Sequence, residues 1–153
     1  MKKVVVIIAL FLSAFSFAQE SYKYVIVPKR FSIFNEDNRF NLNTLTKSFF
    51  ESQGFQVYFA SDILPEELAK NRCLALYVDA NEEKKLFAKS VNIEIKDCYN
   101  NILFFSEYGT SKEKEFVKAY NEAFRIALNS LKGNLKFKNN FVKTPETSKE
   151  VVV

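Results

Sequence analysis

The chain has 153 residues, a formal net charge of +4, no histidine, and an aromatic content of 16%. The length fits one domain, and the small net charge does not indicate a nucleic-acid partner or an anionic-membrane partner. The lack of histidine excludes Ser-His-Asp and Cys-His nucleophile systems and imidazole zinc sites, while 3 glycines are too few for a phosphate-binding loop or a dinucleotide fingerprint. We therefore expect a packed domain without a cofactor or a metal site.

Residues 1–18 have the pattern of a secretory signal peptide. Lys2 and Lys3 form a basic start, an apolar stretch follows, and small residues precede a cleavage site between Ala18 and Gln19. The apolar stretch is shorter than the roughly 20 residues of a membrane span, so we expect cleavage rather than anchoring. The mature chain is then expected to be periplasmic or secreted, with no stable insertion in a membrane.

The first part of the mature chain predicts a strand, a helix and a second strand. Residues 22–28 are β-branched and aromatic and predict a strand. Asn38 is expected to cap a helix that runs to about residue 53 and ends at Gly54. Residues 55–59 predict a strand that the helical connection makes parallel to the first. A short helix is expected over residues 65–70, because proline favours the first helical position.

Residues 71–106 are expected to form the centre of the sheet. The stretches 72–79 and 91–98 predict two antiparallel strands in which Cys73 faces Cys98 and Leu76 faces Ile95. This register places apolar side chains on one face and polar side chains on the other. Both cysteines belong to the exported part, where an oxidising compartment permits a disulfide, and two free thiols are the alternative.

The rest of the chain predicts a loop, one more strand and a long helix. Residues 80–90 are expected to form a long connection with Leu86 and Phe87 near its tip, and residues 102–106 to form a third antiparallel strand. A capping box over residues 110–113 is expected to open the last helix. Its apolar stripe consists of Phe116, Val117, Tyr120, Ala123, Phe124, Ala127, Leu128 and Leu131.

These elements predict an α+β fold with a mixed sheet and helices packed on one face, in the order β-α-β-(short α)-β-β-β-α. The expected domain covers residues 19–133. Residues 134–153 are polar and are expected to form a mobile C-terminal tail, in which residues 135–137 are a candidate edge strand.

Four stretches, 22–28, 42–47, 71–77 and 96–98, resemble those of small secreted proteins of Bacteroidetes, mainly flavobacteria. The resemblance extends over nearly the whole mature chain. It implies a location in the cell envelope and carries no activity over to this sequence. The order of elements is also similar to small α+β domains of bacterial periplasmic and outer-membrane assembly proteins, which is an analogy of fold alone.

Two groups of residues form a candidate contact surface. Tyr77 is expected beside Glu94 and Lys96 on the polar sheet face, where an aromatic ring can contact a partner. The alternative places Tyr77 against the disulfide or beneath the tail. Leu86 and Phe87 are a candidate anchor for a partner or a membrane, and the alternative is that they fold back onto the core.

The exclusions favour an exported, non-enzymatic envelope or secreted protein, a small binding or adaptor domain stabilised by one disulfide. The expected partner is an envelope protein or a glycan. One alternative is a carboxylate-dependent glycan hydrolase that uses Asp79 and Glu94, which are diagonal neighbours in the predicted register. The competing interpretation of these two residues is an ordinary solvated sheet face with cross-strand charge pairs. Another is a structural secreted protein without a fixed partner.

Overall fold

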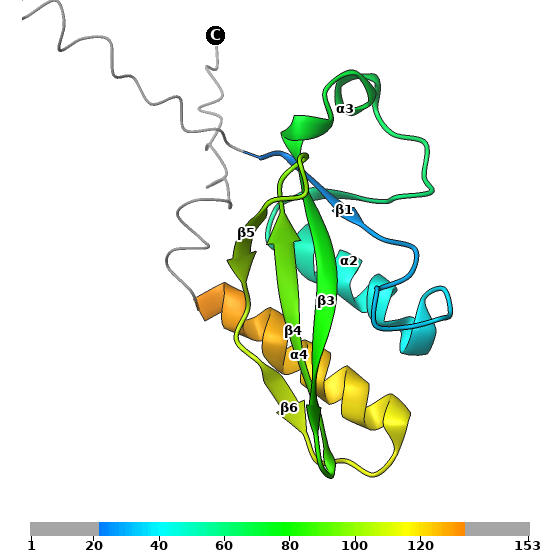
Figure 1. Ribbon diagram of the computed structural model, residues 1–153. Helices are drawn as coiled ribbons and strands as arrows, with labels where there is room; N and C mark the ends of the chain where they lie inside the picture. The colour runs from blue at the N-terminus through cyan, green and yellow to red at the C-terminus, as the bar shows by residue number, and fades with distance from the viewer. Residues whose placement is uncertain (1–21, 134–153) are drawn as a thin grey trace, which may run out of the picture.

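The computed structural model describes residues 22–133 and contains a mixed six-stranded sheet with helices against it (Figure 1). The strand order is β2-β1-β3-β4-β5, and β6 pairs with β4. The strands are β1 (Tyr24–Val27), β2 (Gln56–Phe59), β3 (Ala75–Lys85), β4 (Ala88–Lys96), β5 (Ile102–Phe105) and β6 (Gly109–Ser111). The helices are α2 (Leu42–Ser52), α3 (Glu66–Lys70) and α4 (Phe116–Gly133), with the 3-10 turns η1 (Arg39–Asn41) and η2 (Arg72–Leu74).

The predicted α+β class and mixed sheet are confirmed, and β6 is a strand that the predicted order lacks. The signal peptide, with its cleavage site between Ala18 and Gln19, and the tail over residues 134–153 lie outside the described residues.

The strand-helix-strand unit forms as predicted, and β1 pairs in parallel with both β2 and β3. Helix α2 begins later than expected, because η1 and three residues with positive φ, Asn38, Phe40 and Asn41, precede it. The N-cap residue of α2 is Asn41, so the prediction that Asn38 takes this position is wrong. The side-chain oxygen of Asn38 nevertheless accepts a hydrogen bond of 3.1 Å from the backbone N–H of Thr44 in the first turn. Gly54 has φ of 95°, the left-handed conformation expected of a residue just past a helix.

Two buried clusters occupy opposite faces of the sheet, because successive strand residues point to opposite sides. Val25 and Val27 belong to the larger cluster, with residues of α2 and α4. Tyr24 and Ile26 belong to a smaller cluster with Leu68, the buried residue of α3. The prediction that helices pack on one face therefore holds for α2 and α4 and is wrong for α3, whose single buried side chain covers the second face.

The register of β3 against β4 differs from the prediction by two residues. Val78 pairs with Ile95, where Leu76 was expected. A shift by two keeps each side chain on its face, so the hydrophobic pattern cannot distinguish the two registers. Leu76, Val78 and Ile93 lie in the larger buried cluster in either case.

A disulfide joins Cys73 to Cys98, as predicted, with the two Cα atoms 4.9 Å apart. The expectation that both cysteines lie within paired strands is wrong. Cys73 belongs to η2, where its backbone N–H donates to the side chain of Asn71, and Cys98 follows the end of β4 at Lys96. The disulfide therefore connects two turns at one end of the hairpin.

Helix α4 begins at Phe116, later than the capping box predicts. Thr110 and Ser111 belong to β6, and the Thr110 hydroxyl lies 3.0 Å from that of Ser90 on β4. The hydroxyl side chains of Thr110 and Ser111 are compatible both with the start of a helix and with a strand. In the structure these residues pair with β4 as a strand. Ser111 keeps part of the expected role, since its Oγ accepts a hydrogen bond from the backbone N–H of Glu113.

Gly109 allows β6 to lie directly against α4. A Cβ atom at this position would lie 1.8 Å from the carbonyl oxygen of Ala123 and 2.8 Å from the backbone nitrogen of Ala127. No side chain fits at such distances, so the small residues of both elements determine how closely they approach.

Candidate functional site

The β3–β4 hairpin is longer than predicted and ends in a tight turn. The two strands pair as far as Lys85 and Ala88, so residues 80–85 and 88–90 are paired strand rather than loop. Leu86 and Phe87 form the turn and are 88% and 92% exposed. They lie at the tip, as expected, and do not fold back onto the core.

Phe87 adopts a backbone conformation that is unfavourable for its side chain. Its φ is 60°, in the left-handed region where glycine and asparagine are preferred and other residues lose about 1–2 kcal/mol. Phe40 also has positive φ, but its ring stacks against Tyr120 with centroids 5.5 Å apart. The exposed ring of Phe87 gains no comparable burial, and a strained residue without a packing role is a candidate for function.

The start of α4 lies beside this turn (Figure 1). Phe116 is 62% exposed, although the sequence predicts it in the buried stripe, because α4 only begins there and the stripe is buried from Ala119 onward. A groove of about 420 Å³ separates hairpin and helix. Its lining residues are Lys85, Phe87, Ala88, Lys89, Lys112, Glu113, Lys114 and Phe116. We call Leu86, Phe87, Phe116 and the lysines 85, 112 and 114 the tip surface.

The sequence pattern did not identify Phe116 or the lysines 85, 112 and 114 as members of this surface. The signal that could have found Phe116, Lys112 and Lys114 is the alternation of lysine with other residues just before the apolar stripe. The alternation of lysines does not by itself indicate a contact surface, because the sequence does not show that the hairpin extends to the start of α4.

A polar cluster fixes α4 to the hairpin behind the tip surface. The Tyr120 hydroxyl donates to Glu82 Oε1 at 2.9 Å, and Lys89 Nζ lies 3.3 Å from the same oxygen. Lys89 Nζ also lies 5.3 Å from the ring centroid of Phe116 and 5.2 Å from that of Tyr120. These contacts hold the start of α4, with Phe116, against the hairpin.

The titration of this cluster reflects its partial burial. Burial, followed by the hydrogen bond with Glu82, raises the pKa of Tyr120. For Lys89, burial acts to lower the pKa, but interactions with Tyr120 and Glu82 outweigh it and raise the pKa. Both shifts favour a neutral phenol and a charged ammonium in the folded protein.

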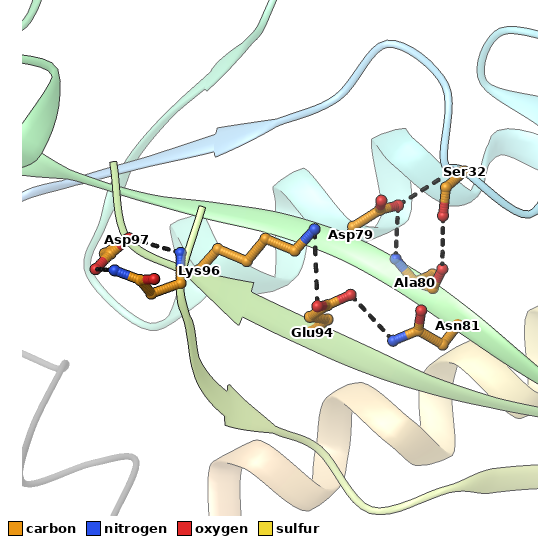
Figure 2. A network of polar contacts seen from close by, with 8 residues as sticks. Ser32, Asp79, Ala80, Asn81, Glu94, Lys96 and Asp97 are labelled. Carbon is orange, nitrogen blue, oxygen red and sulfur yellow. Dashed lines mark hydrogen bonds and ion pairs between the residues drawn. The ribbon is translucent and has the colours of Figure 1, made fainter. Parts of the chain in front are cut away.

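The other candidate contact residues, Tyr77, Glu94 and Lys96, do not form an open platform. The Tyr77 hydroxyl donates to the carbonyl oxygen of Arg72 at 3.0 Å, beside the disulfide, and its side chain packs against the smaller buried cluster. Glu94 is 6% exposed. Its carboxylate accepts a hydrogen bond of 3.1 Å from Asn81 and lies 3.7 Å from Lys96 Nζ (Figure 2).

Asp79 lies directly opposite Glu94, not diagonal to it as predicted, because of the shift in register. Asp79 Oδ1 accepts hydrogen bonds from the backbone N–H groups of Ser32, at 3.0 Å, and Ala80, at 2.8 Å (Figure 2). These contacts give the carboxylate a structural role in joining the β1–α2 loop to β3. A glycan hydrolase that uses this pair stays a prediction from the sequence that the contacts do not favour.

Within residues 22–133, no group of three or more cysteine, aspartate or glutamate side chains is placed to hold a metal ion. No helix in the same range has the length and apolar character needed to span a membrane.

No protein-family model matches the sequence, and no curated protein sequence matches it. The solved structures that are similar in fold include two described as PelC dodecamers from Paraburkholderia phytofirmans. One, of a PelC variant, has a TM-score of 0.45 and 11% identity, with 72% of this chain and 90% of that chain covered. The other has a TM-score of 0.42 and 12% identity over 73% and 86% of the two chains. Similarity at this level carries no functional argument.

Proposed function

We propose that the protein is exported and acts as a non-enzymatic binding domain that contacts another envelope component through the tip surface. The observation that carries this proposal is the exposure of Leu86 and Phe87 at the end of a hairpin paired up to the turn, with strain at Phe87 that packing does not offset. Exposed apolar side chains held in this way are typical of sites of contact.

Export is supported by two features of different kinds. The sequence of residues 1–18 has the pattern of a cleaved signal peptide, and the disulfide between Cys73 and Cys98 suits an oxidising compartment outside the cytoplasm. The expected location is periplasmic or secreted. Mass spectrometry of the protein recovered from the envelope and the medium should give Gln19 as the N-terminal residue, and an uncleaved chain in the cytoplasm would contradict export.

Cross-linking from the tip surface in living cells tests the binding proposal. A photoreactive residue in place of Phe87 should give recurrent cross-links to an envelope component. The control position is Ile63, which is 96% exposed and precedes α3. Helix α3 lies at the opposite end of the molecule from the β3–β4 turn (Figure 1). Equal and unspecific cross-linking from both positions would contradict a contact role for the tip and favour a structural protein without a fixed partner.

A further inference from the structure

We propose that the tip surface docks reversibly on an anionic phospholipid surface, with Leu86, Phe87 and Phe116 in the interfacial layer and lysines at the level of the lipid phosphates. This inference rests on the proposed function and names the partner of the same surface. It concerns peripheral contact and does not require any segment to cross the bilayer.

The shape of the tip suits a bilayer. Leu86 and Phe87 project from the end of a two-stranded ladder that is paired up to Lys85 and Ala88. The backbone groups of β3 and β4 that face each other behind the turn are hydrogen-bonded, so only the turn with its two apolar side chains needs to enter the interface. The β3–β4 turn lies at one end of the molecule (Figure 1), where an extended surface can reach its two side chains.

The charge around the tip is complementary to anionic headgroups. The groove lining contains the lysines 85, 89, 112 and 114 and one acid, Glu113. Lys85 and Lys89 have ion pairs with Glu83 and Glu82. By contrast, Lys84, Lys112 and Lys114 form no ion pair with any residue in the range 22–133. Lysines near an anionic membrane surface add to its attraction and make it sensitive to salt.

The balance of these features predicts weak, reversible binding. A surface with two or three apolar side chains and a few lysines is typical of a peripheral membrane protein. Its binding free energy is too small for a stable membrane anchor. The strain at Phe87 fits this role, because asparagine or glycine would suit the turn better, and neither supplies the aromatic ring that favours the membrane interface.

Co-sedimentation of the exported protein with vesicles tests the proposal. We expect binding to vesicles of phosphatidylethanolamine with phosphatidylglycerol, little binding to phosphatidylcholine alone, and loss of binding as salt is raised. Phe87→Asn, which fits the positive φ and so keeps the turn, should reduce the partition coefficient roughly tenfold. The double variant Lys112→Gln and Lys114→Gln should reduce it by at least about tenfold on the anionic vesicles alone. Ile63→Asn is the matched control and should bind as the wild type.

Circular dichroism and thermal unfolding of each variant establish that the fold is intact. Equal binding to anionic and neutral vesicles, or wild-type binding by both tip variants, would overturn the lipid proposal. If vesicles are not bound but Phe87 cross-links to one protein in cells, the lipid partner is refuted and the binding function stands. If neither vesicles nor cross-links are found, both proposals fail.

Discussion

At the scale of single residues, two phenylalanines with positive φ differ in how their rings are packed. Phe40 precedes α2 and has aromatic partners on two sides, Phe34 and Tyr120, with ring centroids 6.0 and 5.5 Å away. Burial of its ring offsets the strain of its backbone. Phe87 has a similar backbone strain, but its ring is exposed to solvent. Packing within the protein itself therefore does not explain why a phenylalanine occupies this position.

We expect Phe87→Asn to increase the free energy of unfolding by about 1 kcal/mol, because asparagine tolerates the left-handed conformation and an exposed ring contributes little to stability. Urea unfolding of the variant and the wild type measures the change. Leu86→Asn, at the neighbouring position without positive φ, serves as the control and should leave stability nearly unchanged. A less stable Phe87→Asn variant would mean that the ring packs onto the protein.

The glycines give a second prediction at this scale. Gly109→Ala should lower the free energy of unfolding by about 3 kcal/mol, since the added methyl group would collide with the backbone of α4. Gly54→Ala is the comparison, because it meets no atom within 4 Å and carries only the strain of its positive φ, about 1 kcal/mol. Chemical denaturation should rank the two in this order, and a milder effect at Gly109 would show that β6 can move away from α4.

At the scale of elements, the hairpin shows what sequence pattern predicts and where it stops. Alternation assigned Leu76 and Ile93 to the core and Asp79 to the other face, because side-chain direction in a strand has a period of two. The same period made the register uncertain by two residues, and placing the cysteines opposite each other selected the wrong alternative.

Strand length was harder to predict than strand direction. Residues 82–85 are two glutamates and two lysines, a composition typical of loops, yet they continue β3. Their backbone hydrogen bonds to β4 and the contacts of Glu82 with Lys89 and Tyr120 stabilise this part of the strand. The sequence predicts Leu86 and Phe87 near the tip, but the loop-like composition of residues 82–85 hides the strand that leads to them. The contact between Glu82 and Tyr120 joins distant parts of the chain and leaves no local signal, so the exposure of Phe116 beside the hairpin emerges only from the structure.

Removal of the disulfide tests how much the turns at the other end of the hairpin depend on it. The double variant Cys73→Ser and Cys98→Ser should lose roughly 3 kcal/mol of unfolding free energy, because closing the loop between these residues restricts the unfolded chain. The fold should persist, since both cysteines lie outside the β3–β4 ladder.

The control for the disulfide prediction is the wild type with reductant, which should match the double variant. Thiol titration of the denatured, unreduced protein should detect no free thiol. Two titratable thiols in the exported protein would contradict both the bond and the compartment inferred from it.

At the scale of the whole molecule, α4 connects the core to the tip surface. Its buried stripe, from Ala119 to Leu131, packs on the sheet, while its first turn presents Phe116 beside the hairpin. The cluster of Glu82, Lys89 and Tyr120 lies where these two regions meet. The packing of the domain is therefore coupled to the protonation of one phenol and one ammonium group.

Alkaline pH should weaken this packing. The raised pKa of Tyr120 means that the folded protein holds the phenolic proton more tightly than the unfolded chain, whose tyrosines titrate near pH 10. The stabilisation is complete below that pH and is lost as pH rises through the folded-state value, because the folded state then binds more protons than the unfolded state. The raised pKa of Lys89 acts in the same direction at similar pH.

Denaturant unfolding of the wild type from about pH 8 to about pH 11 should therefore show a falling free energy of unfolding in the upper part of the range. Tyr120→Phe should lose about 1 kcal/mol at neutral pH, through the missing hydrogen bond to Glu82, and should show a shallower alkaline decline. Tyr99→Phe, which removes a hydroxyl group from an exposed ring, should follow the wild-type profile. An equally steep decline in Tyr120→Phe would mean that groups other than Tyr120 cause the loss of stability at alkaline pH. The contact with Glu82 would then stabilise the fold without making it depend on pH in this range.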